Sequence, residues 1–159
     1  MGADNDRIVS VERLIPAAAD AIFDVIADPR RHQEIDGSGT VRDADVDGPE
    51  RLSEGAKFGM NMKMGMKYRM VNHVVEFEKD RRIAWAPIPA IGSKELGFIG
   101  GRIWRYELEP AEGGTLVRET WDASGEKGFL FLKLSKAPER TRKAMTATLE
   151  RLEQVVTGA

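Results

Sequence analysis

Glu119 is the residue of this chain whose setting most clearly points to chemistry. Side chains alternate between the two faces of a strand, so Val117 and Trp121 share one face of the predicted strand over 115–122 with Glu119 between them. An isolated charge on an apolar face is costly, and this carboxyl group must therefore be paired, hydrated or protonated. A buried carboxylic acid beside a tyrosine has the chemistry of a general acid or base.

A structural partner is the simpler expectation for Glu119, with Arg102 or Tyr106 as the predicted donor. Two further polar residues lie on a strand that also contributes to the interior, which makes them candidates for proton transfer. The candidate catalytic residues are thus Glu119, Tyr68, Tyr106 and His73.

The apolar residues of the strand that carries His73 move from one face of the strand to the other along its length. Met70 is apolar on one face and Val75 on the other, and a bulge between them would reconcile the two patterns. The sequence therefore leaves open whether His73 faces the interior.

Other motifs in the chain carry little chemistry. His32, Glu34 and Asp36 are possible metal ligands, but their two-residue spacing suits a strand while this segment is predicted to be a helix or a turn. Ser38 lies between two glycines without the rest of a nucleophile-elbow pattern, and 97–101 lacks the spacing of a dinucleotide fingerprint. Surface capping and salt pairing explain His32, Glu34 and Asp36 better, and we expect neither a metal nor a cofactor.

Methionine is concentrated in one stretch, because residues 58–70 hold five of the seven methionines. Alternation puts most of these side chains on one face of two strands joined by a turn at Gly65, with Met64 and Met66 at the rim. Methionine fills irregular cores and also lines surfaces that adapt to varied partners. A ligand wall and an ordinary core are therefore both open.

The same alternation turns all three tryptophans toward this face, and the last helix presents an apolar stripe to it. Binding pockets are mostly apolar, so these side chains form the predicted lining. The predicted ligand-binding residues are Phe58, Met60, Met62, Tyr68, Met70, Trp85, Trp104, Trp121, Met145 and Leu149.

The composition fits one domain over residues 1–159, since 42% of the residues are hydrophobic and 31% are charged. A net charge of −2 predicts no general attraction to nucleic acid or to an anionic membrane. No apolar run approaches the length of a membrane span, and residues 1–6 lack a signal-peptide pattern. The absence of cysteine fits a cytoplasmic location.

Strand patterns dominate the chain. A strand over 7–15 is followed by two short helices, over 17–27 and 29–35, and the chain ends in a helix over 138–157. Six more strands are predicted at 41–46, 56–64, 66–78, 82–86, 102–109 and 115–122. The simplest arrangement is an α+β fold in which a curved antiparallel sheet grips the last helix.

Two segments between these elements are unusual. Residues 87–101 form a connection rich in proline and glycine, and loops of this length are usually functional. Residues 128–134 are almost all apolar and are predicted either to pack beneath the last helix or to close a pocket. Whether either segment forms a lid is left open by the sequence.

The order of these elements resembles the SRPBCC or START-like superfamily. The segments that carry the resemblance, besides the last helix, are IPAAADAIF (15–23), VIADPRRH (25–32), EFEKDRRIAW (76–85), WRYELEP (104–110) and GGT (113–115). The chain looks most like the bacterial polyketide cyclase/dehydrase branch. The resemblance implies a helix-grip fold in which two short helices, a seven-stranded antiparallel sheet and a long C-terminal helix enclose an apolar cavity. It designates no catalytic residue, because the superfamily shares no catalytic motif.

Three functions are compatible with this resemblance. The first is binding of a hydrophobic small molecule, such as a lipid, a polyketide or an aromatic-like compound, in the internal cavity. The second is a polyketide cyclase, aromatase or dehydratase in which Glu119 and a tyrosine move protons. The third is a protein-interaction module of the Hsp90-activator-like or toxin-like type, with an exposed apolar patch around 129–134. Monomer and homodimer are both open.

Overall fold

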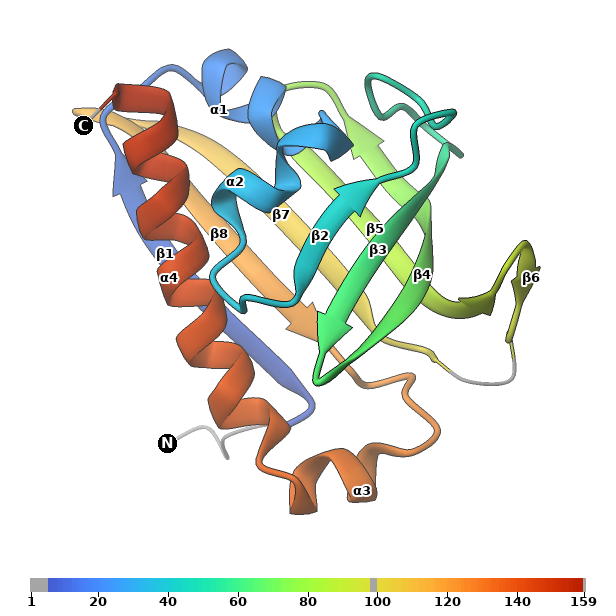
Figure 1. Ribbon diagram of the computed structural model, residues 1–159. Helices are drawn as coiled ribbons and strands as arrows, with labels where there is room; N and C mark the ends of the chain where they lie inside the picture. The colour runs from blue at the N-terminus through green and yellow to red at the C-terminus, as the bar shows by residue number, and fades with distance from the viewer. Residues whose placement is uncertain (1–5, 98–99, 159) are drawn as a thin grey trace.

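A curved antiparallel sheet wraps around the long C-terminal helix in the computed structural model, which describes residues 6–97 and 100–158 (Figure 1). The strands are β1 (Ile8–Ile15), β2 (Val41–Ala44), β3 (Lys57–Met64), β4 (Met66–Glu78), β5 (Arg82–Ile91), β6 (Lys94–Glu95), β7 (Ile103–Ala111) and β8 (Gly114–Asp122). The helices are α1 (Ala19–Ile26), the 3-10 helix η1 (Pro29–Arg31), α2 (His32–Ile35), α3 (Phe129–Leu134) and α4 (Ala137–Thr157). The predicted α+β helix-grip fold is confirmed.

Seven strands follow one another in the order β1-β8-β7-β5-β4-β3-β2, and each neighbouring pair is antiparallel. The short strand β6 lies off this order and pairs with the end of β5. Because β1 pairs with β8, the first and last strands lie side by side at one edge of the sheet. This sheet is the seven-stranded one that the resemblance implies, with β6 added.

Helix α4 lies across the hollow of the sheet (Figure 1). Its buried side chains Met145, Leu149 and Leu152 recur at steps of four and three residues, which puts them on one face. Pro138 stands in the first turn, where its missing N–H costs nothing, and Gly158 ends the helix in the left-handed conformation. The predicted apolar stripe is therefore the surface that the sheet grips.

The connection predicted over 87–101 is largely structured, because β5 continues into it and returns as β6. Among the described residues β7 pairs with β5 only as far as Trp85, and further along, the same side of β5 pairs with β6 instead. The carbonyl of Pro89 accepts from Leu96 N–H at 2.8 Å on this side, and proline is tolerated there because the two-residue strand β6 is the only neighbour that the described residues place on that side. Residues 98–99 lie outside the described residues.

Residues 128–134 contain the short helix α3. Packing beneath α4, one of the two predicted arrangements, holds for Phe129, which is buried in a cluster with Met145. Three other large apolar side chains of this segment are not packed beneath α4. Leu130, Phe131 and Leu134 are 71%, 76% and 76% exposed to solvent. The helix therefore has one anchored side chain and an apolar outer surface.

Candidate functional site

The candidate site lies on the inner face of the sheet, where β7 and β8 pair. Tyr106 is the cross-strand partner of Glu119, and Trp104 is the partner of Trp121 in the neighbouring row. Directly opposed residues of an antiparallel pair point to the same side. Tyr106 packs in the core cluster that includes Leu149 of α4, so this side is the interior. The alternation predicted for these two strands is confirmed.

A hydrogen bond joins the two polar side chains of the site. Tyr106 Oη donates to Glu119 Oε1 over 3.0 Å, and each residue is 4% exposed. The other carboxyl oxygen, Glu119 Oε2, is buried and has no hydrogen-bond partner among the described residues. Arg102, the alternative predicted partner, pairs instead with Glu126 at 3.2 Å. The site thus holds a carboxyl group with one oxygen unused in an apolar setting.

Burial determines the protonation of this pair. Removal from water raises the pKa of Glu119 to about 8, the hydrogen bond from Tyr106 opposes the rise, and the charge of Asp36 adds to it. The pKa of Tyr106 lies well above its usual value, chiefly because of burial and then because of Glu119. Both groups are therefore mostly protonated at neutral pH, and Glu119 has an O–H to present to an acceptor.

An aromatic cluster closes the deep end of the site. The ring of Trp85 lies 5.7 Å from that of Tyr106, stacks on His32 at 5.2 Å and meets Phe58 nearly at right angles at 5.5 Å. His32 Nε2 lies 2.7 Å from the carbonyl oxygen of Ile26, and since a carbonyl only accepts, the imidazole donates from Nε2. Burial lowers the pKa of His32, so its ring is neutral and belongs to the wall.

This place of His32 is not predicted from the sequence, which favours surface capping and salt pairing over a metal site for this segment. Glu34 pairs with Arg31 at 3.2 Å, and the described part of the chain contains no group of three acidic, histidine or cysteine residues that could hold a metal ion. The available signal is the spacing of His32 and Ile35, which are three apart on α2 and both buried. Helix α2 has four residues, so it contains only one such pair and shows no repeated helical spacing in the sequence.

The other two candidate catalytic residues lie away from this pair. Tyr68 is at the rim of the sheet and 37% exposed. His73 faces away from the interior, because its neighbour Asn72 is the residue that shares the inner face with buried Phe58. The ring of His73 instead contacts the carboxylate of Glu95 on β6. The structure therefore brings together Glu119 and Tyr106 only, of the four candidates.

The predicted bulge in this strand lies at Val75, at the far end of the interval expected for it. The register of β4 against β5 shifts between Val74 and Glu76, which leaves Val75 without a partner and half exposed. Phe77 then opposes Ile83 and packs against the core. The bulge comes after His73 and therefore does not turn it inward.

Exposure divides the predicted ligand-binding residues into two groups. The deep group is buried in the core and consists of Phe58, Met60, Trp85, Trp121, Met145 and Leu149. Met62, Met70 and Trp104 are half-buried, and we call these three residues the inner rim. They come from β3, β4 and β7, and Tyr68 lies beside them as the cross-strand partner of Met62. The inner rim marks where the apolar interior reaches solvent.

Two hollows of the described structure lie away from the predicted ligand-binding residues. One hollow of about 290 Å³ lies beyond the turn at Arg81 and is lined mostly by charged side chains. Another, of about 310 Å³, lies between β1 and the start of α4, beside Pro138. Neither contains a predicted ligand-binding residue. The deep group is buried in the core, and the lining of a cavity by the ten residues stays a prediction.

A curved antiparallel sheet that grips a C-terminal helix, with a buried acid on its inner face, defines a protein of the helix-grip class. The chain belongs to the family described as polyketide cyclase / dehydrase and lipid transport, whose model matches residues 6–157. This membership confirms the resemblance found in the sequence. The family description indicates hydrophobic ligands as a class.

Two related sequences are described as uncharacterized proteins. The chain is 36% identical over 149 residues to the uncharacterized protein Rv0088 of Mycobacterium tuberculosis strain H37Rv, an alignment that covers 90% of this chain and 60% of that protein. It is 34% identical to the protein MT0096 of strain CDC 1551 with the same coverage. The chain thus spans about 60% of the length of these relatives.

Solved structures share the fold at low sequence identity. A protein from Arthrobacter aurescens has a TM-score of 0.74 at 16% identity, covering 100% of this chain and 91% of that one. Protein NE0264 from Nitrosomonas europaea has a TM-score of 0.72 at 16% identity, and the match covers 98% of this chain and 97% of that one.

Within the described residues, no helix combines the length and apolar composition that crossing a membrane requires.

Proposed function

We propose that this protein binds a hydrophobic small molecule that carries a carbonyl oxygen or another hydrogen-bond acceptor. The buried, unpaired Oε2 of Glu119 is the observation that carries the proposal. Unpaired buried polar atoms are uncommon in folded proteins, and a ligand group that pairs with this one would explain it. A lipid, a polyketide or an aromatic ketone meets both requirements.

Glu119 would be the donor to this acceptor. Its carboxyl group is mostly neutral at neutral pH, because burial raises its pKa to about 8. Tyr106 already donates to Oε1, which leaves the proton of the acid on Oε2. A molecule without an acceptor would leave this O–H unpaired, so the pair favours ligands that have one.

The inner rim would hold the apolar part of the ligand. Trp104 and Tyr106 stand two residues apart on the same face of β7, which separates them by about 6.6 Å along the strand. A molecule lying against Trp104 would reach the Glu119–Tyr106 pair in the next row inward. Met62 and Met70 have flexible, polarizable side chains that can move aside and repack around it.

A titration with prodan, a neutral fluorescent naphthyl ketone, tests the proposal. We expect saturable binding with a blue-shifted emission, and binding about tenfold weaker, or about 1.4 kcal/mol, for Glu119→Leu. Glu109→Gln on the exposed end of β7 is the matched control and should bind like the wild type. Absence of saturable binding to the wild type, or equal affinity of Glu119→Leu, would contradict the proposal.

A cyclase or dehydratase is the second candidate, because an acid with a pKa near the working pH suits proton transfer. An enol carbon of the substrate would attack a ketone carbon in the same molecule, and the ketone oxygen would take the proton of Glu119. The enol O–H proton would return to the carboxylate, so the acid is regenerated. A simple diketone that closes by intramolecular aldol reaction tests this: turnover above buffer that Glu119→Gln abolishes is expected, and equal turnover by the variant would exclude the role.

A further inference from the structure

Helix α3 carries an apolar surface that no other part of the described structure covers. Phe129 fixes the helix to the protein, because it is buried and the guanidinium of Arg7 lies 4.4 Å from its ring centre. Leu130, Phe131 and Leu134 point outward and are each more than 70% exposed. Three large apolar side chains on six residues of helix are more than the scattered exposure usual for a soluble surface.

The turn between β3 and β4 adds a second apolar tip. Met64 and Met66 flank Gly65 and are 62% and 76% exposed. Gly65 adopts a positive φ of 75°, which allows the tight turn that places both methionines at its end. This turn and α3 both lie at the lower end of the molecule in Figure 1. We call the segments 63–67 and 127–136 together the lower tip.

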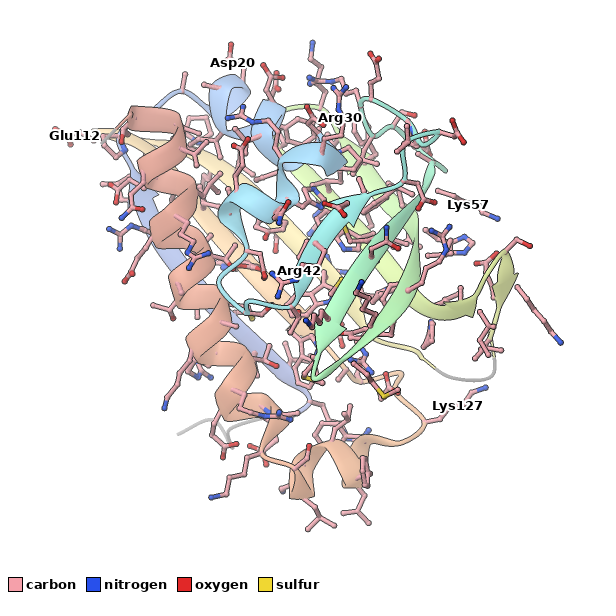
Figure 2. All side chains as sticks on the ribbon, in the orientation of Figure 1. Asp20, Arg30, Arg42, Lys57, Glu112 and Lys127 are labelled. Carbon is pink, nitrogen blue, oxygen red and sulfur yellow. The ribbon has the colours of Figure 1, made fainter. Side chains whose placement is uncertain are left out.

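Every charged residue within the lower tip is a lysine. They are Lys63, Lys67, Lys127, Lys133 and Lys136, and Lys127 is labelled at this end in Figure 2. Three acids lie close to it: Glu126 directly precedes Lys127 and pairs with Arg102 at 3.2 Å, Asp6 pairs with Lys133 at 2.8 Å, and Glu139 follows in the first turn of α4 beside Arg140. The tip keeps an excess of positive charge on a chain whose net charge is −2. The net charge of the whole chain predicts no attraction to an anionic membrane, because it does not show that lysines are concentrated at this tip.

We propose that the lower tip docks on the surface of an anionic lipid bilayer. Phenylalanine and leucine side chains would enter the boundary of the acyl chains, while the flanking lysines meet the lipid phosphates. The charges argue against a second copy of the chain as the occupant, because a symmetric contact through α3 would bring together two tips that each carry an excess of positive charge. The inference rests on α3 and the β3–β4 turn alone and does not require the proposed ligand.

Docking would orient the interior toward the bilayer. Met62 lies two residues from Met64 on β3, so the inner rim begins directly beside the apolar tip of the turn. A hydrophobic molecule leaving the bilayer would meet the inner rim without crossing bulk water. Bilayer docking thereby adds a source of ligand to the proposed binding function.

Sedimentation with phosphatidylglycerol-containing vesicles, compared with pure phosphatidylcholine vesicles, tests the docking. We expect the wild type to sediment with the anionic vesicles at low salt, and at least tenfold weaker binding for Leu130→Ser/Phe131→Ser/Leu134→Ser. Val46→Ser is a matched control, because Val46 is 99% exposed on the loop after β2. Its binding should equal that of the wild type.

A second pair of variants tests the charges. Lys127→Gln/Lys136→Gln should lose binding to anionic vesicles, and high salt should have the same effect on the wild type. Lys79→Gln, in the turn between β4 and β5, should not. A wild type that stays in the supernatant with anionic vesicles, or a triple serine variant that binds as well as the wild type, would overturn the proposal. Self-association that the triple variant abolishes, without vesicle binding, would assign the surface to a second copy and overturn it too.

Discussion

Tyr106 Oη lies 3.0 Å from Glu119 Oε1, and this single hydrogen bond leaves the other oxygen of the buried carboxyl group without a partner in the described structure. The pair lies on cross-strand positions of β7 and β8, so the register of two long strands fixes its geometry. An acid held neutral in an apolar interior is costly for folding and useful for binding or chemistry.

Stability should fall with rising pH because of Glu119. Its pKa is raised to about 8 in the folded state from 4.5, so the folded protein holds a proton that the unfolded chain has lost between these values. The free energy of unfolding should therefore decline from about pH 5 through pH 8, by up to about 1.4 kcal/mol per pH unit, and level off above. Urea unfolding of the wild type against Glu119→Gln measures the difference, and parallel pH profiles would contradict the raised pKa.

Removing both polar groups should separate stability from binding. In Glu119→Leu/Tyr106→Phe no buried polar atom is left unpaired at this position, so the free energy of unfolding at pH 8 should equal or exceed that of the wild type. Prodan affinity should fall at the same time. Chemical denaturation and fluorescence titration on the same samples check this, and a loss of more than about 2 kcal/mol would mean that the pair is structural.

His32 should make the protein sensitive to acid. Burial lowers the pKa of this imidazole from 6.5, so the unfolded chain binds a proton more readily than the folded one. Stability should therefore fall as the pH drops below about 6.5, and His32→Phe, which retains a ring against Trp85, should lack this loss. Thermal unfolding at a series of acidic pH values distinguishes the two, and equal acid sensitivity would show that His32 is not responsible.

The loop after α2 should tolerate no side chain at Gly37. A Cβ at this position would overlap the carbonyl oxygen of Ala144 and come within 2.5 Å of the backbone nitrogen of Thr148 on α4. Gly37→Ala should therefore lower the free energy of unfolding by about 1–3 kcal/mol. Gly128→Ala is the control, because a Cβ there meets nothing within 4 Å and should have little effect. Equal unfolding midpoints of the two variants would contradict this packing.

Alternation of side chains was sufficient to predict the centre of the site. The long strands that carry Tyr106 and Glu119 have no bulge between Trp104 and Leu108 or between Val117 and Trp121. Alternate residues of these stretches therefore lie on the same face of the sheet, as the sequence predicts. His73 could not be placed in this way, because its strand contains the bulge at Val75 and a shift by one residue reverses the face.

Tertiary context explains what the sequence did not predict. His32 belongs to the wall because η1 and α2 fold over Trp85, a contact between segments far apart in the chain. The extension of β5 was missed because Pro89 normally argues against a strand, and only the absence of β7 beside it, within the described residues, makes it compatible. The packing of the deep group depends on the volumes of many side chains at once, which alternation does not encode.

The state of the Glu119 carboxyl group tests the central claim most directly. Carbon-13 NMR of the protein labelled at glutamate carboxyl carbons, with Glu119→Gln to assign the signal, follows its protonation with and without prodan. We expect a midpoint at about 8 and a signal that shifts when prodan binds. A midpoint near the ordinary value of 4.5, or a signal that prodan leaves unchanged while it binds, would contradict the account.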